Sequence, residues 1–95
     1  MPKPPPGFEW DDRKAALNLR KHGVSFALAQ HFDFETALEA RDPESDEHGE
    51  ERFLAIGKIE GRFHALVYTL RGENIRIISL RKAIAYEKRR WRQGE

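Results

Sequence analysis

Residues 68–91, YTLRGENIRIISLRKAIAYEKRRW, decide the fold and carry most of the candidate chemistry. An apolar strand and a turn at residues 72–74 are followed by a second strand, Ile75–Arg81. The basic segment Lys82–Trp91 then has the composition of a helix. From Arg71 to Arg92 there are eight Lys or Arg against two Asp or Glu. A hairpin with arginines at its rims, followed by a basic helix, favours a phosphate-binding surface.

Two helices are predicted before this stretch. The first runs from about Asp12 to His22, with Asp11 or Asp12 as its N-cap and Gly23 as its stop. The second is shorter, is capped by Ser25, and extends to about His31.

Three further strands are predicted between these helices and the final strand. They are Thr36–Ala40, Arg52–Ile59 and Arg62–Leu70, the last two joined by a tight turn at Glu60-Gly61. The acidic segment Asp42–Glu51 is predicted to be a solvated loop. The fold class is therefore α+β, with two N-terminal helices, a three- to four-stranded antiparallel sheet and a C-terminal helix.

The N-terminal residues divide into two parts. Residues 1–7 are rich in proline and are predicted to form a flexible leader, so that residues 8–95 form a single domain. The alternation Phe8-Glu9-Trp10 suits an edge strand or an anchor in the core.

Composition narrows the class of protein. The chain has 95 residues and no cysteine, which excludes disulfides and thiolate metal sites. No apolar run reaches the ~18–20 residues of a membrane span, and the first residues lack a hydrophobic signal segment. We therefore expect a cytoplasmic protein that does not enter a membrane. Residues 1–50 carry a net charge of −5 and residues 51–95 a net of +6, which favours a polyanionic partner.

Several short motifs resemble the BrnT toxin family. The N-terminal ones are Phe8-Glu9-Trp10-Asp11 and Lys21-His22-Gly23-Val24, with Lys14, Asn18 and Phe26. Further along are Gly49-Glu50-Glu51-Arg52, Ala55-Ile56-Gly57, Val67-Tyr68-Thr69 with Arg71, and Ile75-Arg76-Ile77-Ile78-Ser79 with Arg81, Ala83 and Glu87. The resemblance covers about residues 8–91.

This resemblance implies a fold similar to that of RelE-type ribonuclease toxins and an endoribonuclease activity that stops translation. It also implies a partner, the BrnA antitoxin, which has a ribbon-helix-helix DNA-binding domain and neutralises the toxin. The toxin would then reach operator DNA only through the antitoxin. No cofactor is implied.

RNA can be cleaved without a metal when the ribose 2′-OH attacks the adjacent phosphate. The reaction needs a base, an acid, and cations that stabilise the developing charge. The four histidines contain no pair three or four residues apart, so their spacing does not favour a metal site. A metal-independent mechanism is therefore predicted.

The candidate catalytic residues are His22, Arg81 and Glu87. Histidine is the side chain that titrates nearest neutral pH, so His22 suits an acid or a base. Arg81 lies where the last strand meets the helix and suits phosphate binding, and Glu87 is a candidate base. Structural roles are the alternatives: His22 as a helix-end residue interacting with the dipole, and Arg81 in a salt bridge to Glu87 or to the acidic loop. Glu87 could equally form local ion pairs with the basic residues of its helix.

The candidate substrate-binding residues are Lys21, Arg71, Arg76 and Tyr68. Lys21 adjoins His22, and Arg71 and Arg76 flank the hairpin turn, whereas Tyr68 is as typical of a core as of a base-stacking site. Strand alternation places Arg76 and Arg81 on opposite faces unless the strand contains a bulge. A non-catalytic RNA or ribosome binder, and a protein-interaction module, are the rival interpretations of these residues.

Overall fold

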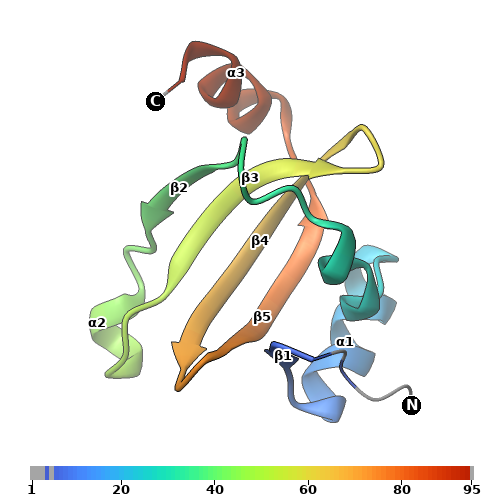
Figure 1. Cartoon of the computed structure of the whole chain (residues 1–95), viewed down its shortest axis with the longest axis vertical. Coiled ribbons are helices and arrows are strands. Elements are labelled where there is room, and N and C mark those ends of the chain that lie inside the picture. The colour runs from blue at the N-terminus through green and yellow to red at the C-terminus, as the bar shows by residue number, and fades with distance from the viewer. Residues whose placement is uncertain (1–3, 5, 95) are drawn as a thin grey trace.

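The computed structural model describes residue 4 and residues 6–94, and it has the predicted α+β class. The predicted leader, residues 1–7, lies partly outside the described residues. A central sheet has the strands β1 (Phe8–Glu9), β2 (Leu38–Arg41), β3 (Phe53–Ile59), β4 (Arg62–Arg71) and β5 (Asn74–Lys82). Their order is β1-β5-β4-β3-β2 (Figure 1).

The predicted sheet of three to four antiparallel strands is wrong in two respects. The sheet has five strands, and it is mixed because β1 pairs in parallel with β5, through Phe8 and Ile75. The other three pairings are antiparallel. Phe8–Glu9 therefore forms the edge strand that its alternation suggested.

The first helix, α1 (Asp12–His22), has the predicted bounds because both of its caps form. Asp11 Oδ1 accepts the Arg13 amide at 2.8 Å, and Gly23 ends the helix with a φ of 70°. The second N-terminal helix is wrong in type: η1 (Phe26–His31) is a 3-10 helix, a form common in short segments.

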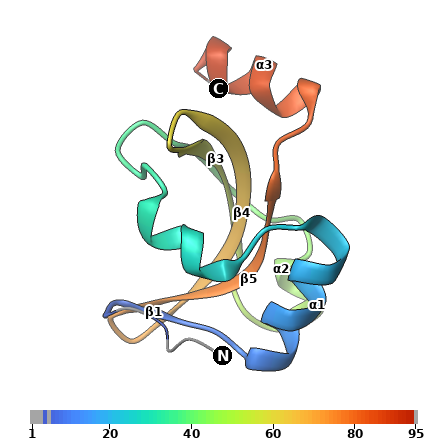
Figure 2. The ribbon, with the colours of Figure 1, turned by 90° about the vertical axis from the view of Figure 1, so that its right-hand side faces the viewer.

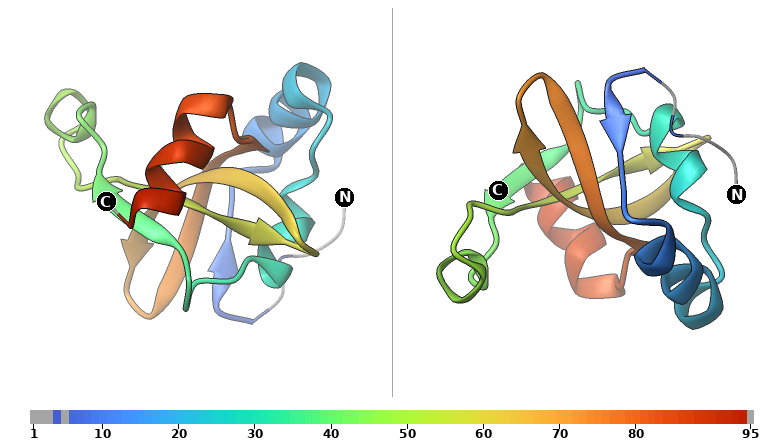
Figure 3. Two further views of the ribbon diagram at one scale, coloured as in Figure 1. Left: turned by 90° about the horizontal axis from the view of Figure 1, so that it is seen from above. Right: turned by 90° about the horizontal axis from the view of Figure 1, so that it is seen from below.

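The remaining helices also refine the prediction. A four-residue helix, α2 (Ser45–His48), forms within the acidic segment that was predicted to be a loop. The C-terminal helix, α3 (Ala85–Gln93), begins three residues after Lys82 because β5 continues through Lys82. In the view from above, α3 lies over the sheet, with α2 on one side and α1 and η1 on the other (Figure 3).

The main core lies between one face of the sheet and the segments α1 and η1. In the edge view the sheet is strongly bent, and η1 lies on its concave side (Figure 2). Gly57 permits this close packing, because a Cβ there would lie 2.7 Å from Phe32 Cζ. The buried cluster consists of Ala15, Val24, Phe26, Ala29, Phe32, Ala55, Ile59, Leu66, Tyr68, Ile77 and Leu80.

A β-bulge at Ile78 changes the direction of the side chains along β5. Val67 pairs with Ser79 but Tyr68 pairs with Ile77, so Ile78 is the extra residue on β5. Ile77 and Leu80 are consequently both buried on the core face, although strict alternation would put residues three positions apart on opposite faces.

Because of the bulge, the prediction that Arg76 and Arg81 lie on opposite faces of the sheet is wrong. Arg76 pairs with Thr69 and Arg81 pairs with Ala65. Directly paired residues point to the same side of a sheet, and Ala65 and Thr69 are four residues apart on β4. Arg76 and Arg81 therefore share a face, although five residues of strand, about 15 Å, separate them.

Asn18 joins α1 to β5 beyond the point where β1 ends. Its Nδ2 donates to the carbonyl of Leu80 at 2.7 Å and to that of Val24 at 3.0 Å, and its Oδ1 accepts the Leu80 amide at 3.2 Å. Asn18 is 7% exposed. This amide thus replaces a neighbouring strand at Leu80 and fixes the position of α1 along β5.

Replacing Asn18 by alanine is expected to destabilise the fold by about 2–4 kcal/mol, because three buried backbone groups lose their partner. Chemical denaturation measures the loss. The control is Gln30→Ala, which removes an exposed side-chain bond to the Ala27 carbonyl and should cost little. Equal stability of the Asn18 variant and the wild type would contradict this role.

Candidate active site

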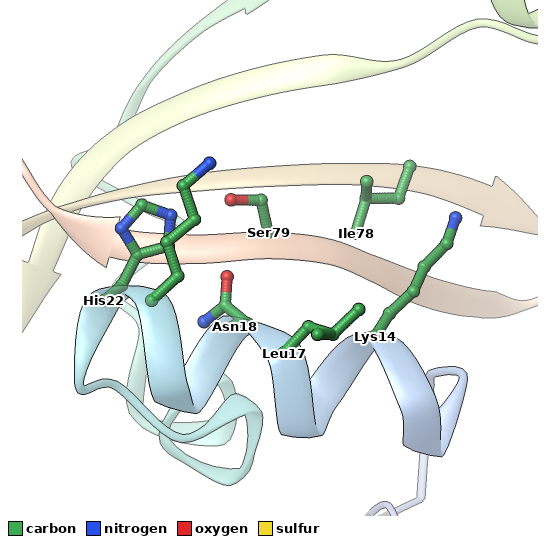
Figure 4. A pocket seen from close by; sticks show the side chains of 7 residues that line it. Lys14, Leu17, Asn18, His22, Ile78 and Ser79 are labelled. Atoms are coloured by element: carbon green, nitrogen blue, oxygen red, sulfur yellow. The ribbon is translucent and has the colours of Figure 1, made fainter.

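A cationic groove lies between α1 and β5, with a volume of about 220 Å³. Lys14, Asn18 and His22 rise from one side of the helix toward the strand, and the Ser79 hydroxyl lies on the side nearer His22 (Figure 4). The complete lining is Lys14, Leu17, Asn18, Lys21, His22, Ile78 and Ser79. No acidic side chain lines the groove, so it suits an anion.

Helical spacing brings these side chains together. Lys14, Asn18 and Lys21 follow one another at intervals of four and three residues, which places them on one face of α1. His22 lies in the last turn, where the helix dipole favours a cation. The bulge at Ile78 supplies the opposite wall, since it places Ile78 and Ser79 next to the helix.

Arg81 of β5 and Glu87 of α3 form a bidentate ion pair. Arg81 Nη1 and Nη2 donate to the two carboxylate oxygens of Glu87 at 2.8 and 2.9 Å. The Ile84 amide donates to the same carboxylate at 2.9 Å and so caps the start of α3. The pair therefore ties the end of β5 to α3.

This pairing shifts the pKa of both groups. The hydrogen bonds from Arg81, more than those from the Ile84 amide, hold the pKa of Glu87 below its usual range despite its burial. The same carboxylate raises the pKa of Arg81. A carboxylate with three donors and a lowered pKa is a weak proton acceptor, so Glu87 is better placed to orient Arg81 than to act as a base.

Arg81 does not line the groove that holds Lys21 and His22. Ser79 lines the groove, and Arg81 lies two residues further on the same face of β5, an advance of about 7 Å. The sequence predicted that Lys21-His22 would approach Arg81. Lys21 and His22 line the groove with Ser79, whereas Arg81 does not line it, so this approach stays a prediction.

Arg76 and Arg71 do not line the groove, and each forms an ion pair with a glutamate. Arg76 pairs with Glu9 at 3.0 Å, beside β1. Arg71, at the far end of the hairpin, pairs with Glu50 at 3.5 Å.

Tyr68 is a core residue. Its side chain packs against Phe34 and Phe53, and its hydroxyl donates to Glu39 at 2.7 Å. Burial, and then the bond to Glu39, raises the pKa of Tyr68. Its side chain is on the core face, opposite to Arg81, so the two do not form one site.

Sequence reasoning did not select Lys14, Asn18 or Ser79 as site residues. The signal for Lys14 and Asn18 was present, because both share a helical face with Lys21. Ser79 had no comparable signal, since its place in the groove depends on the bulge at Ile78.

With this geometry in view, the family can be assigned. The site is a cationic, acid-free groove in a small α+β domain, an arrangement that suits an anionic ligand. Residues 10–87 match the family described as the ribonuclease toxin BrnT of type II toxin-antitoxin systems, and the chain belongs to this family. A search among curated proteins finds no match. Within the described part of the chain, no helix is long and apolar enough to span a membrane.

Replacing Glu87 by glutamine should destabilise the protein at pH 7 by about 2–3 kcal/mol, less than for a fully buried ion pair because Arg81 stays 29% exposed. A lowered pKa stabilises the fold above the unfolded value near 4.5, and this contribution is lost as the pH falls further. The difference between variant and wild type should therefore shrink below pH 4.5. Denaturation curves at several pH values measure it.

The matched control is Glu73→Gln, at an exposed position in the β4–β5 turn. It should leave stability nearly unchanged at every pH. A Glu87→Gln effect of the same size at pH 3 and pH 7 would show that the charge of the pair is not the cause.

Proposed function

We propose that this protein is a metal-independent endoribonuclease that inhibits translation by cutting RNA. The observation that carries the proposal is the position of His22 and Lys21 in an acid-free groove, with Arg81 two residues beyond its wall residue Ser79 on β5. The family assignment supports a ribonuclease toxin. The proposed mechanism and residue roles go beyond that assignment.

The proposed reaction is an internal displacement at phosphorus. The ribose 2′ oxygen attacks the adjacent phosphate, the bond from phosphorus to the 5′ oxygen breaks, and a 2′,3′-cyclic phosphate and a 5′-OH result. One proton leaves the 2′-OH and one reaches the 5′ oxygen. We assign one of these transfers to His22 and the other to solvent water.

The cations are assigned to the phosphate. A single charge pair at about 4 Å is worth roughly 4 kcal/mol at an effective dielectric near 20. Lys21 has no acid partner among residues 4 and 6–94 and so offers its full charge. Arg81 is partly neutralised by Glu87, and we assign it to fixing the orientation of the phosphate, with Glu87 as its positioning residue.

Substrate binding by Arg71, Arg76 and Tyr68 stays a prediction. The ion pairs of Arg71 and Arg76 and the burial of Tyr68 favour structural roles for these side chains. No group of three or more His, Cys, Asp or Glu among the described residues is placed to hold a metal ion.

The partner that we propose is a BrnA-like antitoxin with a ribbon-helix-helix domain, acting with the toxin in the cytoplasm. A type II toxin-antitoxin family implies a protein antitoxin and an RNA substrate. We further propose that contact with operator DNA is made through the antitoxin alone. Added antitoxin should stop RNA cleavage, and cleavage that continues at saturating antitoxin would contradict its neutralising role.

The purified protein is expected to cut RNA in the presence of EDTA. His22→Ala should lower the cleavage rate by about 10²–10⁴-fold, the range for losing an acid or base. Lys21→Ala should lower it by about 10²–10³-fold, as for a lost transition-state charge contact. Rates are measured on a labelled RNA in single-turnover conditions.

The control is His48→Ala, at an exposed histidine of α2 whose nearest ion-pair partner is Glu44. It should cut RNA at the wild-type rate. If the His22→Ala variant cuts RNA at the wild-type rate, the catalytic role assigned to His22 is contradicted. Absence of cleavage by wild-type protein that still binds RNA would instead support a non-catalytic RNA binder.

A further inference from the structure

A second cationic groove lies at the opposite side of the β5 end, between the β3–β4 turn and the start of α3. Its volume is about 380 Å³. The lining residues are Gly61, Arg62, Phe63, Lys82, Ala83 and Lys88. Three of these are cations and none is an acid, so this groove has the same charge character as the groove beside α1.

The cations of this second groove are not neutralised within the chain. Among residues 4 and 6–94, Arg62, Lys82 and Lys88 form no ion pair, whereas Arg71 and Arg76 each pair with an acid. Like charges held together raise the free energy of the folded state. An anionic ligand would relieve this repulsion.

Two aromatic rings hold further cations at the rim. Lys58 Nζ lies 5.3 Å from the ring centre of Phe63 and 4.9 Å from that of Trp91. Arg92 Cζ lies 5.5 Å from the ring centre of Phe63. The Trp91 indole is itself fixed, since its Nε1 donates to the Thr36 carbonyl at 2.9 Å. These contacts concentrate five unpaired cations at this end of the molecule.

The two grooves are lined by successive parts of β5. Ser79 lines the first and Lys82 lines the second, and three residues of strand span about 10 Å. Arg81 lies between them. One phosphate group cannot reach both grooves, but an extended polynucleotide can.

We propose that the second groove binds the backbone phosphates of a single-stranded RNA that flank the phosphate held near Lys21, His22 and Arg81. The proposal rests on the proposed function and adds the extent of its substrate. A single RNA strand crosses the end of β5, and Arg62, Lys82 and Lys88 contact its backbone. Continuity with the first groove favours RNA over an acidic peptide as the ligand.

The test measures binding of a short 2′-O-methyl RNA, which lacks the attacking hydroxyl and so is not cut. The variant combines Arg62→Gln, Lys82→Gln and Lys88→Gln. Loss of three phosphate contacts should weaken binding about 100-fold at 0.1 M salt and reduce the slope of log K against log salt by about 2. Fluorescence anisotropy at several salt concentrations gives both values.

The control variant removes the same charge from cations outside both grooves, by combining Arg13→Gln, Arg20→Gln and Arg89→Gln. It should bind RNA with nearly the wild-type slope. An equal loss of slope in the two variants would overturn the proposal, because total charge and not the groove would then govern binding. Thermal unfolding of both variants shows that each is folded at the assay temperature.

Three further measurements bear on the proposal. Polyglutamate binding that falls as much as RNA binding in the groove variant would overturn the assignment to RNA. A dinucleotide substrate should be cut at the wild-type rate by the groove variant, because it reaches only the first groove. Lost dinucleotide cleavage would contradict this division. If the wild-type protein binds RNA but does not cut it, the proposed catalysis is contradicted. The proposed RNA binding by the second groove is then still supported.

Discussion

The bonds from Asn18 to the backbone of Leu80 are the interaction on which the rest of the structure depends. β1 covers β5 only at Ile75 and Arg76, so the edge of β5 beyond that point needs another partner. The Asn18 amide satisfies this edge from a helix and therefore sets how far α1 extends along the strand. Because His22 is one turn further along α1, the same contact places the imidazole beside Ser79.

Some cations of the described residues are neutralised by an acid of the same chain, and others are not. Arg71, Arg76 and Arg81 are held by Glu50, Glu9 and Glu87, which lie on three different elements or loops. The cations that line the two grooves form no ion pair among the described residues, and most of them lie near the end of β5. A net charge of +1 thus conceals a local cationic surface, and such a surface attracts a polyanion more strongly than the total charge suggests.

Local signals predicted much of the fold. Caps at Asp11 and Gly23 gave the bounds of α1, and glycine turns gave the long hairpins, because each signal acts within a few residues. The parallel pairing of β1 and the bulge at Ile78 depend on contacts between distant segments, and no local pattern encodes them. For the site, Lys21 and His22 share a groove as a pair, whereas residue type alone could not separate the ion-paired Arg76 from an available cation.

The position of the RNA site at the end of β5 is tested most directly by backbone amide chemical shifts during titration with a short 2′-O-methyl RNA. We predict the largest changes at Lys21–Gly23, at Ile78–Lys82, and at Arg62 and Lys88. Arg71 and the β4–β5 turn should change little. Shift changes centred on Arg71 and residues 72–74, with α1 unaffected, would contradict a site built where α1 docks on β5.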